Sequence, residues 1–194
     1  YIRRFSPFAQ RIREVTSQRH DPMILNYRMN AGYIPLDNWV HTAEGGGRNL
    51  GEACHIYDLF TFLTQSEIMD IEAKSIQPKT GYYSSQDNFI ASLRFQDGSI
   101  ASLTYTALGT SEYPKELMEV YVDGKVLKLD DYKKLDVHGA RVKGYAGKVT
   151  DKGHLVELIA LADSIRNEKE WPIPLWQQVQ AAEISFQVEK LLTP

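Results

Sequence analysis

The region from residue 68 to residue 145 constrains the fold most strongly, because it consists of short strand-like stretches separated by glycine turns. Asp97-Gly98 is a strong two-residue hairpin signal. Similar turns follow at Asp123-Gly124, His138-Gly139 and Lys143-Gly144. Consecutive hairpins produce an antiparallel sheet. The pattern predicts strands at Ile68–Gln77, Asn88–Phe95, Ser99–Thr106, Met118–Val122, Lys125–Asp130, Lys133–Val137 and, as a weaker candidate, Arg141–Tyr145.

Helical patterns lie on both sides of this strand region. Ser6-Pro7 predicts a helix start, with Ser at the N-cap and Pro in the first turn. One early strand is predicted at Met23–Asn30, and further helices at about Asn49–Thr64, His154–Asn167 and Gln177–Leu192. We therefore predict one α+β domain over residues 1–194, with a predominantly antiparallel open sheet and helices packed on one face. The other sheet face is free to pair with a second subunit or with another domain, and an uncovered face favours a homo-oligomer.

The composition excludes several classes of protein. A formal net charge of −3 argues against nucleic-acid binding, and we interpret the early arginines as a solvated helix face: Arg3, Arg4, Arg11 and Arg13. No apolar run reaches the roughly 18 residues of a membrane span. The single cysteine, Cys54, cannot form a disulfide within the chain and makes a cysteine zinc site unfavourable, which fits a cytoplasmic protein. Because the chain starts at Tyr1 rather than Met, we expect a fragment of a longer protein.

Residues 31–47 are rich in Gly, Pro, Asn and Asp and predict a long loop. Loops beyond about 12–15 residues in compact domains are usually functional or disordered, and the aromatic Trp39 favours function. Trp39 either stacks on the ring of a ligand or only anchors the loop. At the end of the loop, Gly46 and Gly47 allow a ligand or backbone to approach closely. Without a preceding strand, however, these glycines are not the dinucleotide-binding fingerprint.

The helix that follows the glycines carries Glu52, His55 and Asp58. Each carboxylate is three residues from His55, so either one could contact the imidazole. A neighbouring carboxylate fixes the tautomer of a histidine and raises its basicity, which suits general acid–base catalysis. A structural His–Asp pair is the alternative. Most other positions of this helix are apolar, so we expect it to be buried, with its polar residues facing a pocket or an internal network.

Two arginines are further candidates for ligand contacts. Arg28 lies in the middle of the first strand beside Asn26 and Asn30. It is either an ordinary charge on the sheet surface or a clamp for a carboxylate or phosphate. Arg48 begins the helix that carries His55, where its charge opposes the helix dipole. That local misfit points to an anionic partner.

Several of these segments together resemble a known family. Asn26-Tyr27-Arg28, Asn30-Ala31-Gly32, Trp39 and the run from Glu44 to Asp58 are similar to the C-terminal domain of the glucose–fructose oxidoreductase / inositol dehydrogenase (Gfo/Idh/MocA) family of NAD(P)-dependent oxidoreductases. The order of elements matches along essentially the whole chain. The resemblance implies a dihydrodipicolinate-reductase-like C-terminal domain, which supplies a pocket for a sugar-like or polyol substrate and a sheet face for oligomerisation.

The resemblance also implies what lies outside this chain. Residues 1–5 would be the exit strand of an N-terminal Rossmann domain that binds NAD or NADP, so no cofactor is expected on this domain alone. His55 would exchange a proton with a substrate hydroxyl, and Asp58 would orient His55. The family's Glu-Lys-Pro motif, whose Lys acts beside the histidine, is absent here.

One departure from the family bears on the chemistry. Many members carry an Asp four residues before the histidine, where this chain has Gly51. Glu52 is adjacent but rotated by about 100° around the helix. Either Glu52 substitutes for the Asp with a shifted geometry, or that role is lost. The loss of the Asp favours the alternative function, a non-catalytic binding or assembly module that keeps the fold.

Overall fold

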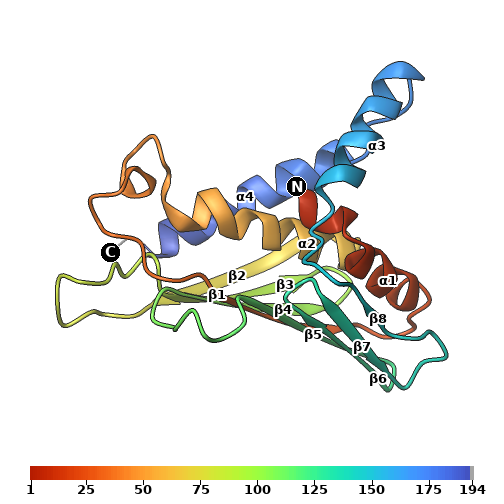
Figure 1. Cartoon of the computed structure of the whole chain (residues 1–194), viewed down its shortest axis with the longest axis horizontal. Helices are drawn as coiled ribbons and strands as arrows, with labels where there is room; N and C mark the ends of the chain where they lie inside the picture. Colours follow the sequence, from red (N-terminus) through yellow and green to blue (C-terminus); the bar gives the residue numbers. More distant parts are fainter. Residues whose placement is uncertain (193–194) are drawn as a thin grey trace.

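The structure, a computed structural model, describes residues 1–192. Over that range it has two layers, an eight-stranded sheet and a set of helices that cover one of its faces (Figure 1). The strands are β1 (Ile24–Asn30), β2 (Ile68–Ser75), β3 (Phe89–Phe95), β4 (Ile100–Thr106), β5 (Glu116–Val122), β6 (Lys125–Asp130), β7 (Lys134–His138) and β8 (Tyr145–Ala146). The predicted α+β class, with a mostly antiparallel open sheet and helices on one face, is confirmed.

The strand order is β2-β3-β4-β1-β5-β6-β7-β8. The predicted hairpins β3–β4, β5–β6 and β6–β7 are antiparallel neighbours in the sheet. However, β1 is inserted between β4 and β5 and runs parallel to β4. Its central place has a physical reason, because a strand with neighbours on both sides leaves no backbone edge unpaired. The sheet is therefore built from two hairpin groups joined by the first strand of the chain.

The helices begin where the local sequence favours them. The main helices are α1 (Pro7–Thr16), α2 (Cys54–Thr64), α3 (His154–Arg166) and α4 (Leu175–Leu192). The predicted cap of α1 is confirmed, because Ser6 Oγ accepts a hydrogen bond of 3.0 Å from the Ala9 amide. A π-helical turn, η3 (Asn49–Ala53), precedes α2. The exit strand expected at residues 1–5 is instead a 3₁₀ helix, η1 (Ile2–Phe5).

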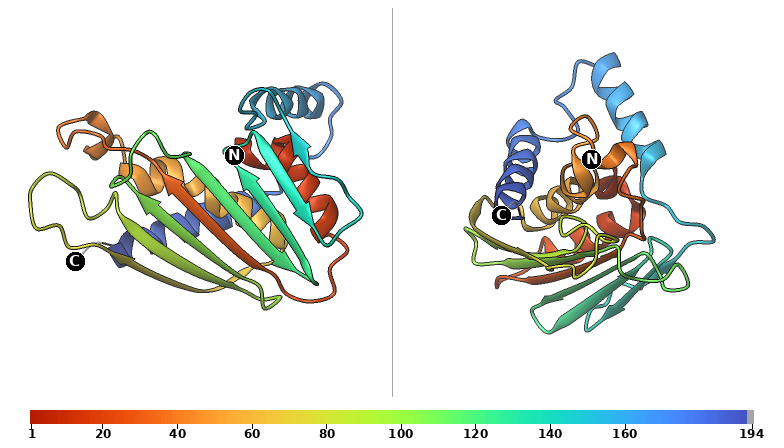
Figure 2. Two further views of the ribbon diagram at one scale, coloured as in Figure 1. Left: turned by 60° about the horizontal axis from the view of Figure 1, so that its bottom comes forward. Right: turned by 90° about the vertical axis from the view of Figure 1, so that its left-hand side faces the viewer.

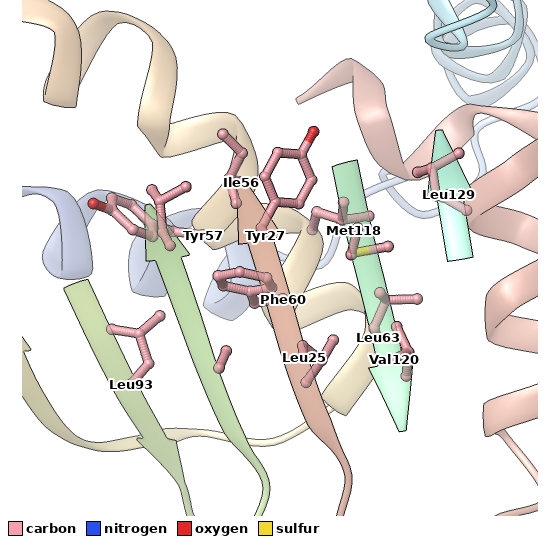
Figure 3. Close-up of a cluster of buried hydrophobic side chains, with 14 of the residues drawn as sticks. Leu25, Tyr27, Ile56, Tyr57, Phe60, Leu63, Leu93, Met118, Val120 and Leu129 are labelled. Carbon is pink, nitrogen blue, oxygen red and sulfur yellow. The ribbon is translucent and has the colours of Figure 1, made fainter. Parts of the chain in front are cut away.

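The hydrophobic core lies between α2 and the centre of the sheet (Figure 3). Strand β1 alternates, with Leu25, Tyr27 and Met29 buried beneath the helices. Phe60 of α2 packs against this layer, and its ring meets the Tyr27 ring edge-on. Because α2 has most of its side chains buried, the polar groups that it carries are held in a rigid setting.

Buried charges attach the first residues of the chain to the sheet. Arg3 Nε donates a hydrogen bond of 3.0 Å to Glu116 at the start of β5, and both side chains are buried. Tyr27 and Lys152 also donate to Glu116. The interpretation of the early arginines as a solvated helix face is wrong for Arg3 and Arg4, which are buried and paired. It fails because partners distant in sequence neutralise these charges.

The second face of the sheet carries no helix of the described chain (Figure 2). The figure also shows α3 projecting away from the sheet, on the side of the helical layer. No helix within residues 1–192 combines the length and the apolar character needed to cross a membrane. Pairing of the open sheet face with a second copy stays a prediction.

Candidate functional site

The glycine run closes a tight turn between the long loop and the helix that carries His55. Within the loop, Trp39–His41 forms a 3₁₀ turn, η2, and the Gly46 amide donates to the Thr42 carbonyl at 3.0 Å. A Cβ at Gly45 would lie 2.2 Å from the carbonyl oxygen of Trp39, so only glycine fits there. Gly46 and Gly47 have φ values of 69° and 73°, which glycine adopts without strain. The turn brings the loop back over the start of α2 (Figure 1).

A cavity of about 350 Å³ lies under this turn. It joins the long loop, the first turn of the His-bearing helix and the segment before β5. The residues that line it are Ala31, Ile34, Trp39, Val40, Gly45, Gly47, Arg48, Gly51, Glu52 and Lys115. Four of the predicted site residues thus meet here, namely Trp39, Gly47, Arg48 and Glu52. Gly46 shapes the turn above the cavity without lining it.

Glu52 is the electrostatic centre of the cavity. Its carboxylate accepts hydrogen bonds from the Tyr105 hydroxyl at 2.5 Å, Lys115 Nζ at 2.8 Å and Arg48 Nη2 at 3.4 Å. Burial by itself raises the pKa of Glu52, but Lys115, Tyr105 and Arg48 outweigh burial and hold it at about 2. Glu52 is therefore ionised at neutral pH and accepts hydrogen bonds, so it cannot donate a proton.

Arg48 is held from several sides at the base of the cavity. Its Nε donates to the Tyr105 hydroxyl at 2.6 Å, and its Nη2 donates to the Ala31 carbonyl at 3.2 Å. The side chain is buried, and its guanidinium lies over the Tyr105 ring. Arg48 was predicted to need an anionic partner, and Glu52 supplies that charge within the protein. The negative charge of Glu52 thereby offsets the unfavourable interaction between Arg48 and the helix dipole.

His55 lies in the turn that follows η3 and does not line the cavity. Its ring packs edge-on against Tyr1, with 5.8 Å between the ring centroids. Its Nδ1 is buried and has no hydrogen-bond partner among residues 1–192. Burial, then the charges of Arg3 and the terminal ammonium, lower the pKa of His55 to about 4. The imidazole is neutral at pH 7 and can accept a proton.

Asp58 contacts Arg4 rather than His55. Its two carboxylate oxygens accept from Arg4 Nε at 2.9 Å and Nη2 at 2.5 Å, in a bidentate pair that is almost fully buried. Arg4 Nη1 also donates to Gln177 of α4 at 2.6 Å. The structure therefore does not bring Asp58 to His55 as an orienting partner. Asp58 instead joins the start of the chain to α2 and α4.

The remaining candidate, Arg28, lies on the opposite side of the sheet from His55. Its neighbours in β1, Tyr27 and Met29, face the helices, so Arg28 points to the open face. Its Nη1 donates to the Pro114 carbonyl at 2.6 Å, and its guanidinium lies 4.5 Å from the centre of the Tyr113 ring. The structure separates Arg28 from the cavity, and local contacts account for its position.

Two residues of the network, Tyr105 and Lys115, are missing from the predicted site. Tyr105 is inward-facing in β4, and the alternation of that strand marks it as a core residue rather than a polar one. Lys115 precedes β5, where no local pattern distinguishes it from other surface lysines. Only the long-range contact with Glu52 identifies it. Across residues 1–192, no group of three or more His, Cys, Asp or Glu side chains is placed to hold a metal ion.

The lowered pKa of His55 predicts a dependence of stability on pH. Below pH 6.5 the unfolded chain binds a proton at His55, whereas the folded chain does so only near pH 4. Stability from this group is therefore complete above pH 6.5 and is lost as the pH falls towards 4. Because the ring is partly exposed, we expect a loss of no more than about 2 kcal/mol.

Urea unfolding at pH 7 and pH 5 measures this effect, with His55→Gln as the comparison. The wild-type chain should lose more stability between the two pH values than the variant, which has no titrating imidazole. His154→Gln, at an exposed position at the start of α3, is the matched control and should behave as wild type. Equal pH dependence in wild type and His55→Gln would contradict the prediction.

Comparison with known proteins identifies the family of this chain. Residues 11–128 match the model of the GFO/IDH/MocA C-terminal domain. The fold is similar to UDP-N-acetylglucosamine 3-dehydrogenase GnnA from Acidithiobacillus ferrooxidans, with a TM-score of 0.77, 18% identity, and 99% of this chain and 61% of that one covered. It is also similar to an NAD binding oxidoreductase from Klebsiella pneumoniae, with a TM-score of 0.77, 14% identity, and 97% and 62% coverage.

A third similar structure is GenD2 from gentamicin A biosynthesis in complex with NAD, with a TM-score of 0.74, 13% identity, and 98% and 60% of the two chains covered. The present chain thus spans about three fifths of the length of these proteins. The comparison with curated proteins found no match. The family model covers more than half of the sequence, and the chain therefore belongs to the GFO/IDH/MocA C-terminal domain family.

Proposed function

We propose that this chain is the substrate-binding and oligomerisation domain of a nicotinamide-dependent oxidoreductase that acts on a sugar-like or polyol substrate. The observation that carries the proposal is the cavity under the glycine turn, one helical turn from a neutral histidine, in a domain of this family. Similar structures support it by their descriptions, which include a sugar-nucleotide dehydrogenase and an oxidoreductase with NAD+ and L-tartaric acid.

In this proposal the residues of the chain bind the substrate and receive its proton. Trp39 offers an exposed aromatic face to the ring of a sugar, and Glu52 and Lys115 offer an acceptor and a donor to its hydroxyl groups. His55 lies outside the cavity lining, so in this proposal the substrate extends from the cavity to the imidazole, which is neutral at pH 7 and accepts the hydroxyl proton. Removing this proton prevents a high-energy alkoxide from accumulating as the carbon loses hydride.

A nicotinamide cofactor would supply the hydride acceptor. Gly45, Gly46 and Gly47 do not follow a strand and do not form a dinucleotide-binding turn, so we assign cofactor binding to a further domain. Similar structures that are longer than this chain agree with a two-domain protein. We assign oligomerisation to the sheet face that no described helix covers.

The test is hydride transfer by the full-length polypeptide that carries this domain. Absorbance at 340 nm should rise when NAD or NADP is mixed with the substrate from a panel of pyranoses, sugar acids and inositols. The 194-residue chain alone should give no such signal, because in this proposal the cofactor binds to the further domain. Binding of sugars without any hydride transfer by the full-length protein would reject the oxidoreductase and favour the non-catalytic module.

A further inference from the structure

The lining of the cavity under the glycine turn has one more positive charge than negative charges. Three of its lining residues are charged, the cations Arg48 and Lys115 and the anion Glu52. Glu52 contacts both cations, so its single negative charge is shared between them. The other lining residues are apolar or glycine. The buried Asp87, outside the lining, also interacts electrostatically with Arg48, so the positive charge that a ligand meets is that of Lys115.

Lys115 is the cation that remains available to a ligand. Arg48 is buried, and its donors are engaged by Tyr105, Ala31 and Glu52. The Lys115 side chain is 41% exposed, and its only partner within residues 1–192 is Glu52. An ammonium group has three donors, so two of them are free to bind an incoming anion.

Part of the cavity lining is apolar. Ile34, Trp39 and Val40 belong to it, and Trp39 is 67% exposed. An aromatic face with aliphatic neighbours suits the C–H face of a sugar ring. The cavity therefore combines a surface for a ring with one cationic donor group.

We propose that the cavity binds a sugar acid, with the ring against Trp39 and the carboxylate on Lys115. A carboxylate carries one negative charge to match the ammonium of Lys115, whereas a phosphate ester carries about −1.5 to −2 at neutral pH and would be repelled more strongly by Glu52. This inference rests on the proposed function, since it names the substrate class of the same site. Its test is binding in the absence of cofactor, so it can fail or hold independently of hydride transfer.

The experiment titrates the chain with D-glucuronate and with D-glucose, followed by saturation-transfer NMR at 50 mM and 300 mM NaCl. Glucuronate should bind at least tenfold more tightly than glucose at low salt, and the advantage should shrink at high salt because ions screen exposed charges. Glucose 6-phosphate should bind more weakly than glucuronate. Equal binding of glucose and glucuronate, tighter binding of the phosphate, or no binding of any probe would each overturn the proposal.

Variants of Lys115 test whether this residue causes the preference for glucuronate over glucose. Lys115→Met keeps an unbranched side chain that is one atom shorter and has no charge, and it should reduce glucuronate binding to the level of glucose. Lys115→Arg should retain most of the preference. Lys169→Met is the matched control, because Lys169 is also an exposed lysine, pairs with Asp163 at 2.7 Å and lines neither this cavity nor the adjacent one that Lys115 also lines. Glucuronate binding that survives in Lys115→Met would overturn the assignment, provided that its thermal unfolding matches wild type.

Discussion

Replacing Asp58 by Leu is expected to lower the free energy of unfolding by about 3–5 kcal/mol. The change leaves the guanidinium of Arg4 buried without the carboxylate that holds it at 2.5 Å and 2.9 Å. Gln177 would remain as a neutral partner and cannot replace the lost charge. Urea unfolding at pH 7 measures the loss as a shift of the midpoint at unchanged slope.

The double variant Arg4→Met/Asp58→Leu gives the decisive comparison. It removes both charges, so we expect it to be more stable than Asp58→Leu alone. The exposed pair Arg11–Glu14 serves as the control, because its nitrogen and oxygen are also close, at 2.8 Å, but lie in solvent. Arg11→Met should cost less than about 1 kcal/mol. A small effect of Asp58→Leu, similar to that of Arg11→Met, would show that the buried pair does not stabilise the fold.

The second large effect is expected in catalysis by the full-length protein. His55→Gln should lower kcat by about 10²- to 10⁴-fold, the contribution usual for a positioned acid–base group. Glutamine keeps a polar side chain of similar size but cannot take up a proton near neutral pH. The measurement is the initial rate of nicotinamide reduction at saturating substrate, from pH 5 to pH 9.

The control for this variant is His41→Gln, since His41 lies on the long loop and its side chain is close to Asp87. It should change kcat far less than His55→Gln. Unfolding in urea at pH 7 checks that His55→Gln remains folded. If kcat of a folded His55→Gln variant equals that of wild type, His55 is not the proton acceptor.

The strand and helix patterns could be read from the sequence because they depend on local spacing. Ser6-Pro7 starts α1, and the alternation of β1 buries Leu25 and Tyr27 beneath the helices. The predicted strand Met118–Val122 starts two residues later than β5 itself, which begins at the buried Glu116. A charged residue at a strand start gives no apolar signal, and only Arg3, Tyr27 and Lys152 explain its burial.

In the candidate site, too, local sequence predicted some residues and long-range contacts brought in the others. The sequence predicted a site at Trp39, Arg48 and Glu52, and these residues do line one cavity. It did not predict Lys115, which is 63 residues from Glu52 along the chain. Asp58 and His55 are close in sequence, yet the carboxylate points to Arg4 and the imidazole packs against Tyr1. Spacing on a helix limits which of its side chains can contact one another. Residues from other elements of the fold decide which of these contacts form.

By itself, the sequence determined the elements, the class of the fold and the segment that lines the cavity. Hydrophobic periodicity and turn residues are local patterns that extend over a few positions, so they can be recognised in a single sequence. The tertiary structure alone decided that β1 lies between β4 and β5, that Arg3 and Arg4 are buried, and that Lys115 faces Glu52. These features depend on charges and strands that meet across many residues. The free energy of a buried charge depends on the cost of its desolvation and on the gain from its pairing in the folded state. Local sequence encodes neither quantity.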